Sequence, residues 1–382
     1  MSKPYAAIVG GAAGVALVAI FIILWFCKSH CKNFSNKNSE TGSSDPYAVV
    51  EWNRGGQCSS APGRPLFGSQ GARAFTMDEL EQATKQFSES NLIGYGSFGS
   101  VYKGLLQDTT VAIKRRPSAP REDFVAEVFY LSEIRHRNLV SLLGYCQERD
   151  SQMLVFEYVP NDSIGNHLYD TGLTSSTKLE FKQRLSIALG AAKGLCHLHG
   201  LNPPLVHKNF KTTNVLVDEN FLVKVADAGI SKLLEKIEEA GPSYTSGVNV
   251  FWDPETGVSG TFTEMSDVYS FGVFLLELIT GQEAIHLGFL GYDEGLIQWV
   301  ASRLNSNNFV DRRLLGSFTE DGIRDLIRLT LQCMSFPRIG RPKMEMIVVE
   351  LERIHEKEMA LTTVTGDGTA TFIKGSELFT SK

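Results

Sequence analysis

The alternation of apolar and polar residues divides the chain into three parts. Residues 5–27 include no charged side chain, and a helix of that length, at about 1.5 Å per residue, exceeds the roughly 30 Å hydrocarbon core of a bilayer. Residues 28–74 are rich in Ser, Asn, Gly and Pro without sustained apolar periodicity, which predicts a flexible linker. Periodic apolar positions resume at Phe75 and continue to about residue 356.

The first part is predicted to be a retained transmembrane helix. A cleavable signal peptide is the competing interpretation, but the apolar run is longer than the usual 7–15 residues and no small-residue cleavage site follows it. Lys28 and Lys32 follow the helix whereas only Lys3 precedes it, which favours a cytoplasmic C-terminal side. We therefore expect a single-pass protein of the plasma membrane, with residues 1–4 on the other side and no ligand-binding ectodomain.

Small residues and cysteines in this part support two further hypotheses. Gly10 and Gly14 form a GxxxG pattern, which would allow a helix-mediated dimer, although small residues are common in membrane helices without any such role. Cys27 and Cys31 lie at the membrane edge and are candidates for palmitoylation.

The periodic region begins with strands and continues with helices. Thr76 and Glu79 have the spacing of a capping box and predict a short helix. Residues 91–106 and 109–116 are rich in β-branched residues around turn-forming sequence and predict paired strands, and residues 121–134 have a helical apolar face. Further helices are expected at residues 178–199, 266–281, 294–304, 321–334 and 344–356. The fold class is therefore α+β, with a small strand-rich part to about residue 158, a larger helical part after it, and a loose tail from 357 to 382.

Composition narrows the functional classes. The chain has 382 residues, of which 43% are hydrophobic and 21% charged, as in ordinary globular proteins. The net charge of −6 argues against a nucleic-acid partner. The six cysteines have neither metal-ligand nor disulfide-framework spacing, so those of the main body are expected to be reduced thiols.

A glycine-rich segment, GYGSFGSV, begins at Gly94 and includes Gly96 and Gly99. A Rossmann site would require a helix after the glycines and an acidic residue about 20 positions on, whereas here a strand follows and the later residue is Lys114. A glycine-rich hairpin can lie close over phosphates. Lys114 would then reach the α- and β-phosphates, and Glu127 would hold that lysine as its ion partner.

Three later segments complete a set of motifs. His207 to Asn214 has the spacing of the kinase catalytic loop H-R-D-x-x-x-x-N. Asp227, Ala228 and Gly229 stand where D-F-G is usual, and Asp253, Pro254 and Glu255 stand where A-P-E is usual. The set resembles that of a protein kinase. The order of the motifs and their separation along the chain are specific to that class of protein.

The chain resembles the plant receptor-like kinases, which belong to the same broad family as the animal Pelle kinases. The resemblance is carried by FTMDELEQAT, HRNLVSLLGYC, LVFEYVPNDSIGNHLY, SDVYSFGVFLLELITG and GRPKMEMIVVELE, and it covers roughly residues 75–356. It implies a bilobal protein-kinase fold. It also implies that Phe156 is the gatekeeper and that Glu157 to Val159 form the hinge. Val101, Ala112 and Leu216 would line the adenine slot. Asp267 would steady the catalytic loop, and Glu255 would pair with Arg341.

The resemblance breaks at positions that concern chemistry. Asn209 replaces the catalytic Asp, and a neutral amide can orient a hydroxyl but is too weak a base to take its proton. General-base assistance is worth about 10²–10⁴ in rate. Lys208 replaces an Arg, Ala228 replaces the Phe of D-F-G, and Val248 stands where a Thr is usual. Together these departures predict impaired catalysis.

The groups that bind nucleotide are retained. Asn214 and Asp227 supply oxygen ligands suited to Mg²⁺, and Lys114, Glu127 and Lys211 remain, the last by resemblance neutralising the γ-phosphate. These residues predict binding of ATP with Mg²⁺. The alternative is that they are remnants in a collapsed pocket.

The predicted function is that of a membrane-anchored pseudokinase in signalling. It would bind ATP and act as an allosteric partner or scaffold of another membrane receptor-like kinase. The alternatives are an active Ser/Thr kinase of low turnover and a membrane adaptor that needs no nucleotide. Residues 243–246 (Ser-Tyr-Thr-Ser) would accept phosphate from another kinase or would form a merely solvated loop.

Overall fold

The computed structural model describes residues 71–169, 179–237, 249–287, 300 and 309–361. The predicted membrane helix, most of the linker, the cluster at 243–246, Val248 and residues 362–382 lie outside this set. Across the described residues, no helix combines the length and the apolar character needed to cross a bilayer. The expectations about the membrane segment therefore stay predictions.

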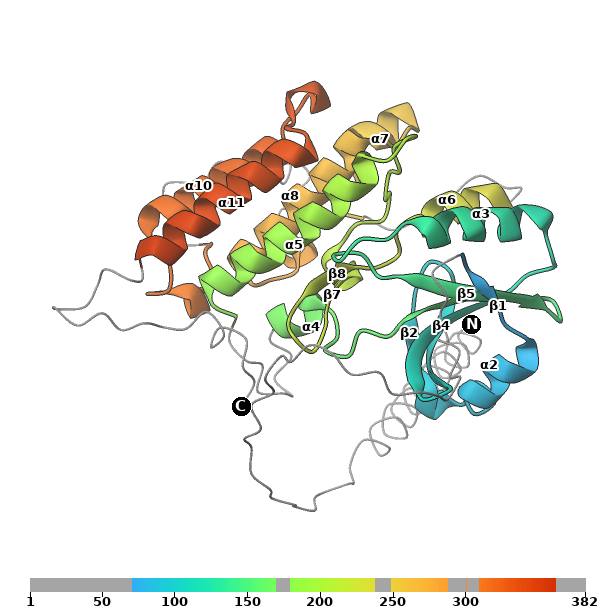
Figure 1. The fold of residues 1–382 in the computed structure, drawn as a ribbon. Coiled ribbons are helices and arrows are strands. Elements are labelled where there is room, and N and C mark those ends of the chain that lie inside the picture. Colours follow the sequence, from blue (N-terminus) through green and yellow to red (C-terminus); the bar gives the residue numbers. More distant parts are fainter. Residues whose placement is uncertain (1–70, 170–178, 238–248, 288–299, 301–308, 362–382) are drawn as a thin grey trace, which may run out of the picture. The chain divides into compact units, whose positions relative to one another are not determined.

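The small lobe is built on a six-stranded sheet with the order β1-β5-β6-β4-β3-β2 (Figure 1). The predicted strand pair is confirmed, since β3 and β4 are antiparallel along their length and Tyr102 lies opposite Ile113. Side chains alternate across a strand, and Val111 and Ile113 on β4 are fully buried. The strands are β1 (Arg73–Ala74), β2 (Leu92–Tyr95), β3 (Ser100–Leu106), β4 (Thr109–Pro117), β5 (Leu142–Glu148) and β6 (Ser151–Glu157).

Two helices, α2 (Met77–Ala83) and α3 (Glu122–Glu133), flank this sheet. The predicted capping box of α2 is present, because the Thr76 hydroxyl accepts from the Glu79 amide and the Glu79 carboxylate accepts from the Thr76 amide. The predicted apolar face of α3 is also present, and Phe124 is fully buried in the main core.

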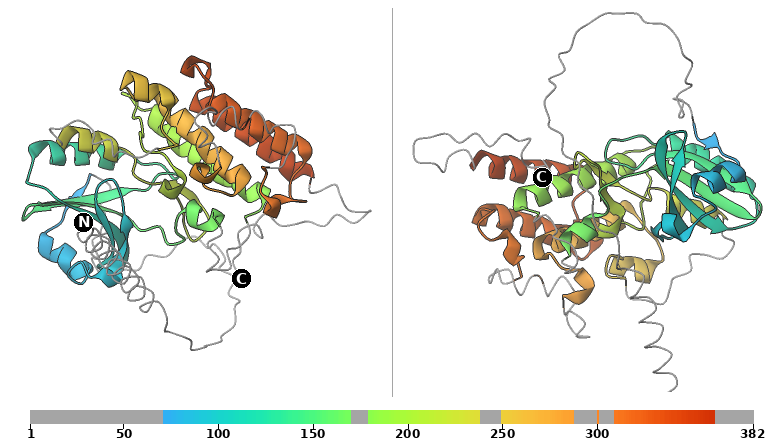
Figure 2. Two further views of the ribbon diagram at one scale, coloured as in Figure 1. Left: turned by 180° about the vertical axis from the view of Figure 1, so that it is seen from behind. Right: turned by 90° about the horizontal axis from the view of Figure 1, so that it is seen from below.

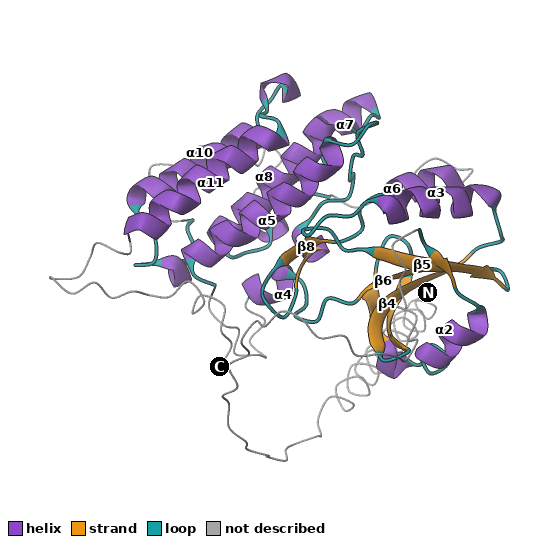
Figure 3. Ribbon diagram, in the orientation of Figure 1, coloured by secondary structure: helices purple, strands orange, loops and turns teal. Residues whose placement is uncertain are grey.

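The large lobe is mainly helical (Figure 3). Nearly every residue of its helix α8 (Glu264–Thr280) is buried, which explains why that segment is apolar on all sides rather than on one face. The remaining elements are α4 (Ile164–Leu168), α5 (Phe181–His199), β7 (Val215–Val217), β8 (Val223–Val225), α6 (Ile230–Ile237), α7 (Pro254–Ser259), α10 (Glu320–Cys333) and α11 (Met344–Leu361).

The regular structure extends past both expected boundaries. At the start, Arg73 in β1 pairs in parallel with Gly144 in β5, and two residues are too few to show a periodicity. At the end, α11 continues beyond residue 356, where the buried carboxylate of Glu358 accepts a hydrogen bond from the Thr319 amide at 3.2 Å. This contact ties the end of α11 to the start of α10.

Candidate functional site

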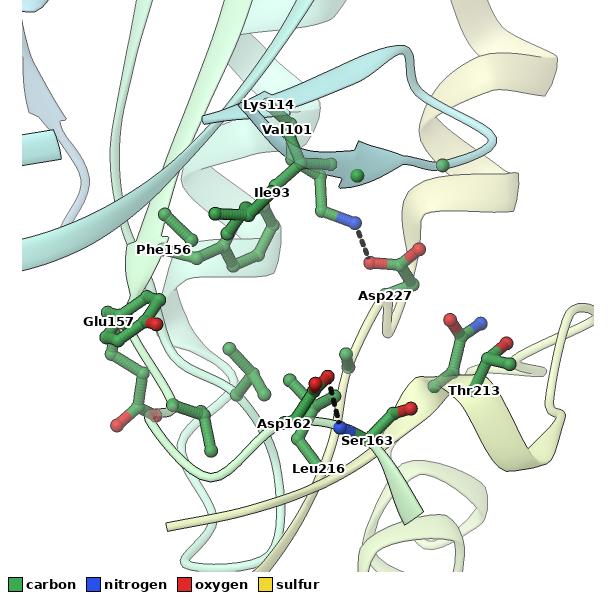
Figure 4. Close-up of a pocket in the computed structure, with 18 of the residues that line it drawn as sticks. Ile93, Val101, Lys114, Phe156, Glu157, Asp162, Ser163, Thr213, Leu216 and Asp227 are labelled. Carbon is green, nitrogen blue, oxygen red and sulfur yellow. Dashed lines mark hydrogen bonds and ion pairs between the residues drawn. The ribbon is translucent and has the colours of Figure 1, made fainter. Parts of the chain in front are cut away.

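A cavity of about 470 Å³ lies between the glycine-rich hairpin, the end of β6 and the β7–β8 hairpin (Figure 4). Apolar side chains line it together with polar groups in separate places, among them Lys114 with Asp227 and Asp162 with Ser163 (Figure 4). Most residues predicted to bind nucleotide or metal line it, together with Phe156. They are Gly94, Gly96, Val101, Ala112, Lys114, Glu157, Val159, Asn214, Leu216 and Asp227.

Four of the predicted site residues, Gly99, Glu127, Asn209 and Lys211, do not line this cavity. Gly99 shapes the hairpin, since its φ is +140° and an added Cβ would lie 2.2 Å from the Arg115 carbonyl oxygen, so only glycine fits there. Lys211 lines a neighbouring cavity of about 390 Å³.

Several lining residues were not predicted. Most of them are chain neighbours of motif residues, and that proximity was the available signal. They are Ile93, Tyr95, Val140, Pro160, Asp162, Ser163, Thr213 and Ala226.

An ion pair lies in the wall of the cavity. The Lys114 ammonium contacts the Asp227 carboxylate (Figure 4), and these side chains are only 12% and 5% exposed. Asp227 has a φ of +66°, a left-handed conformation that non-glycine residues adopt at some cost. The cation expected to bind phosphate and the carboxylate expected to bind metal therefore neutralise each other here.

The expected Lys114–Glu127 ion pair is not formed in this structure. Glu127, which is 5% exposed on α3, instead lies 2.9 Å from the Lys232 Nζ and 3.6 Å from the Lys236 Nζ, both on α6. The prediction of that partner was wrong for this arrangement because it took no account of α6, which follows Gly229 and packs beside α3.

The catalytic loop is held by buried Asp267 of α8, as the resemblance implies. The Asp267 carboxylate accepts from the His207 amide at 2.7 Å, the Lys208 amide at 2.9 Å and the His199 Nε2 at 2.8 Å. Lys208 has a φ of +64°, and these bonds fix its strained backbone.

Asn209 is positioned through its backbone. Its amide donates to the His207 Nδ1 at 3.3 Å, and its carbonyl accepts from the Asn214 Nδ2 at 2.9 Å. The side-chain amide of Asn209 makes no hydrogen bond with any other described residue. It is therefore free to contact a substrate hydroxyl, for which it is an acceptor but not an effective base.

The chemistry of the donor set fits Mg²⁺ held jointly with phosphates. The Asn214 Nδ2 is used within the loop, which leaves its Oδ1 available, and Asp227 supplies a carboxylate. The described part of the chain has no group of three or more His, Cys, Asp or Glu placed to hold a metal ion alone. Mg²⁺ commonly relies on one or two protein ligands plus substrate phosphates.

The end of the A-P-E-like segment is anchored in the large lobe. Arg341 is 1% exposed and makes the predicted contact with Glu255, at 3.2 Å. Its stronger partner is Asp253, whose two carboxylate oxygens lie 2.7 and 2.9 Å from the guanidinium. This bidentate pair was not predicted.

The two lobes, the cavity between them and the catalytic loop together define the protein-kinase fold. A family model described as protein tyrosine and serine/threonine kinase matches residues 87–351. The chain belongs to this family, and its relatives place it among the plant receptor-like, Pelle-type kinases.

Two relatives are from Arabidopsis thaliana. The proline-rich receptor-like protein kinase PERK3 is 39% identical over 290 residues, covering 73% of this chain and 56% of PERK3. The probable serine/threonine-protein kinase PBL21 is 39% identical over 292 residues, covering 74% of this chain and 76% of PBL21. The chain therefore spans about half the length of PERK3, one of its receptor-like relatives.

A solved structure is also similar. It is that of the pseudokinase domain of BIR2, described as an immune regulator of the RLK/Pelle family, with a TM-score of 0.62 and 29% sequence identity. The match covers 74% of this chain and 86% of that one. The bilobal kinase fold and the receptor-like family predicted from the sequence are thus confirmed.

Proposed function

We propose that this protein is a membrane-anchored pseudokinase that binds ATP with Mg²⁺ and signals mainly as a partner of another membrane receptor-like kinase. One observation carries the proposal. Lys114, Asn214 and Asp227 line the cavity, whereas the catalytic loop presents the Asn209 amide in place of a carboxylate. The site is thus suited to hold a triphosphate and poorly suited to deprotonate a hydroxyl.

The barrier to phosphoryl transfer follows from Asn209. Its amide can orient a hydroxyl, but the proton has no carboxylate to receive it, and the loss of general-base assistance is about 10²–10⁴ in rate. Kinase transition states are stabilised largely by positioning and by charge neutralisation. Lys211 would neutralise the γ-phosphate and preserve a residual rate, so impaired activity is expected rather than complete loss.

The nucleotide would be held by groups from both lobes. Adenine would lie between Ala112 and Leu216, and Lys114 would contact the phosphates once it leaves Asp227. Asn214 and Asp227 would hold Mg²⁺, which supplies charge neutralisation at the phosphates when bound.

The membrane anchor and the partner rest on other observations. Residues 5–27 are apolar and uncharged, and relatives such as PERK3 are receptor-like kinases by name. The BIR2 domain shows that the family includes a pseudokinase with a regulatory role. A partner kinase would bind the surface of the nucleotide-bound domain, and the signal would not depend on phosphoryl transfer by this domain.

Two measurements on the full chain, purified in detergent, test this proposal. The first is a fluorescence titration with mant-ATP and Mg²⁺, and the second is transfer of labelled phosphate to a generic protein substrate. We expect binding in the wild type, at least tenfold weaker binding in Lys114→Ala because a phosphate contact is removed, and little transfer above the Lys114→Ala background.

The alternatives give different results. Transfer in the wild type well above the Lys114→Ala background would establish the active Ser/Thr kinase instead. Neither binding nor transfer would leave the adaptor that needs no nucleotide. Either result contradicts the proposal.

A further inference from the structure

We propose that residues 372–379, near the C-terminal end of the sequence, dock on an exposed apolar strip at the start of helix α11. The apolar strip consists of Phe336 and Ile339 in the turn before α11, and of Met346 and Val349 in the first turns of α11. Helices α10 and α11 lie on the side of the large lobe away from the small lobe (Figures 1 and 2). The strip is therefore separate from the nucleotide cavity, and the inference does not depend on that site.

The four side chains of the apolar strip are strongly exposed although they are large and apolar. The exposed fractions are 74% for Phe336, 90% for Ile339, 62% for Met346 and 65% for Val349. Met346 and Val349 are three residues apart in a helix and therefore lie on the same face. Single exposed apolar residues are common on protein surfaces, whereas several close together mark an interaction surface.

The backbone beneath the apolar strip is anchored in the large lobe. On the opposite face of α11, Met344, Ile347 and Leu351 are at most 1% exposed and belong to the main core, and α11 packs against α5. In the turn before α11, the Arg338 amide donates to the Glu255 Oε1 at 2.6 Å. A docking surface on a fixed backbone loses little conformational freedom when a segment binds to it.

The chain itself supplies a segment that can reach the apolar strip. Helix α11 ends at Leu361, so residues 362–382 leave from the end of the helix opposite to the strip. Along the helix axis, Met346 lies about 22 Å from Leu361, at about 1.5 Å per residue. Residues 362–372 span up to about 36 Å when extended. They are therefore long enough to turn and return along α11.

The apolar residues of this segment are grouped like those of the apolar strip. Phe372 and Ile373 form one apolar pair and Leu378 and Phe379 form a second, whereas Thr, Ser and Gly are frequent in the rest of residues 362–382. The strip likewise has one pair on α11 and one pair in the preceding turn. A segment that returns antiparallel to α11 would place its first pair on the helix and its second pair on the turn.

Charged residues between the pairs favour the same antiparallel direction. Lys343 and Glu345 are exposed between the two pairs of the strip, and neither forms an ion pair with another described residue. In the segment, Lys374 follows the first apolar pair and Glu377 precedes the second. Antiparallel docking would bring Lys374 to Glu345 and Glu377 to Lys343. Parallel docking would bring like charges together, which repel each other.

Tethering favours this segment over a separate molecule. A segment joined by a short linker has an effective concentration in the millimolar range. Contacts that are too weak to retain a separate partner are therefore sufficient to keep the segment docked on the strip.

The test is amide hydrogen exchange on the full chain purified in detergent, with each rate compared with that of an unstructured chain of the same sequence. Exchange over residues 372–379 should be at least about threefold slower than in such a chain. The double variant Phe372→Ser with Phe379→Ser should lose this protection, and exchange over residues 336–343 should become faster in it. Val364→Ser, which changes an apolar residue outside the docked segment, should leave both rates unchanged.

Variants on the surface of the large lobe test the other side of the contact. Val349→Asp places a charge in the apolar strip and should remove the protection of residues 372–379, whereas Leu105→Asp, at a 58% exposed residue of β3, should not. Glu345→Lys and Lys374→Glu should each reduce the protection by roughly twofold to fivefold, as expected for an exposed ion pair. Combining these two changes restores opposite charges and should recover most of the protection.

Three results would overturn the proposal. The first is no protection of residues 372–379 in the wild type, and the second is protection that is equal in Val349→Asp and in the wild type. The third is protection of the strip that persists in the double serine variant and rises with protein concentration, which would assign the strip to a second copy of this chain. No readout uses nucleotide, so the outcome is independent of Mg–ATP binding.

Discussion

Arg341 shows how much one side chain can fix at the residue scale. Its buried guanidinium binds both oxygens of Asp253, contacts Glu255 and donates to the Ser335 and Met265 carbonyls. Arginine suits this position because its planar fork matches a carboxylate with two parallel bonds. The result is a fixed junction between the end of the A-P-E-like segment, α8 and the start of α11.

Arg341→Ala should lower the free energy of unfolding by about 3–5 kcal/mol, because it leaves the buried Asp253 carboxylate without its partner. The matched control is Arg324→Ala, since Arg324 is 60% exposed and pairs with Asp321 on the surface. That change should cost no more than about 1 kcal/mol. Equilibrium urea unfolding measures both. Equal losses in the two variants would contradict this account of the junction.

Residue identities at the site were largely predictable where a motif specifies them. The role of Asp267 and the Glu255–Arg341 contact followed from the resemblance and are present. The bidentate Asp253 pair was missed because it depends on how the guanidinium is oriented by carbonyls from distant segments. No spacing in the sequence specifies that orientation.

At the element scale, the packing of α5 against α11 brings together side chains that are far apart in the sequence. The His355 Nε2 on α11 lies 3.0 Å from the Ser186 Oγ on α5. Burial, and then the nearby charge of Lys182, lowers the pKa of His355 below its ordinary value of 6.5. The imidazole is therefore neutral in the folded protein at pH values where it would take a proton in the unfolded chain.

This shift gives stability a pH dependence of known sign. The folded state lowers the pKa of His355. The contribution of its neutral imidazole to folding stability is therefore fully present above pH 6.5 and is lost as the pH falls through 6.5 toward the folded pKa. His355→Gln keeps a group that can bond to Ser186 but cannot titrate. Urea unfolding at pH 7.5 and 5.5 should show a smaller loss of stability in this variant. An identical or larger loss would contradict the assignment.

The long helices were predictable from the sequence, and the short helix α6 was not. The helical period located α3, α5, α8, α10 and α11 within a few residues. Helix α6 was not predicted, although Ile230, Leu233 and Ile237 have helical spacing. Eight residues are too few for a helix to be stable alone, and α6 depends on the core and on α3 for its stability.

At the scale of the whole molecule, ion pairs join the small lobe to the large lobe. Lys114 pairs with Asp227, and Glu127 pairs with Lys232 and Lys236 of α6 instead of with Lys114. The sequence predicted the two lobes and the nucleotide residues but not this exchange of partners. Arrangements that differ by a few kcal/mol can be shifted by a ligand with different affinities for them.

The central proposal is that the cavity binds a triphosphate and that Asn209, in place of the catalytic Asp, is the main cause of weak phosphoryl transfer. Its most direct test is the rate of phosphoryl transfer in Asn209→Asp relative to the wild type, with both proteins shown to bind Mg–ATP. Restoring the carboxylate should raise the rate by at least tenfold and up to about 10⁴-fold. A wild-type rate equal to that of Asn209→Asp, at the turnover of an ordinary kinase, would contradict the claim.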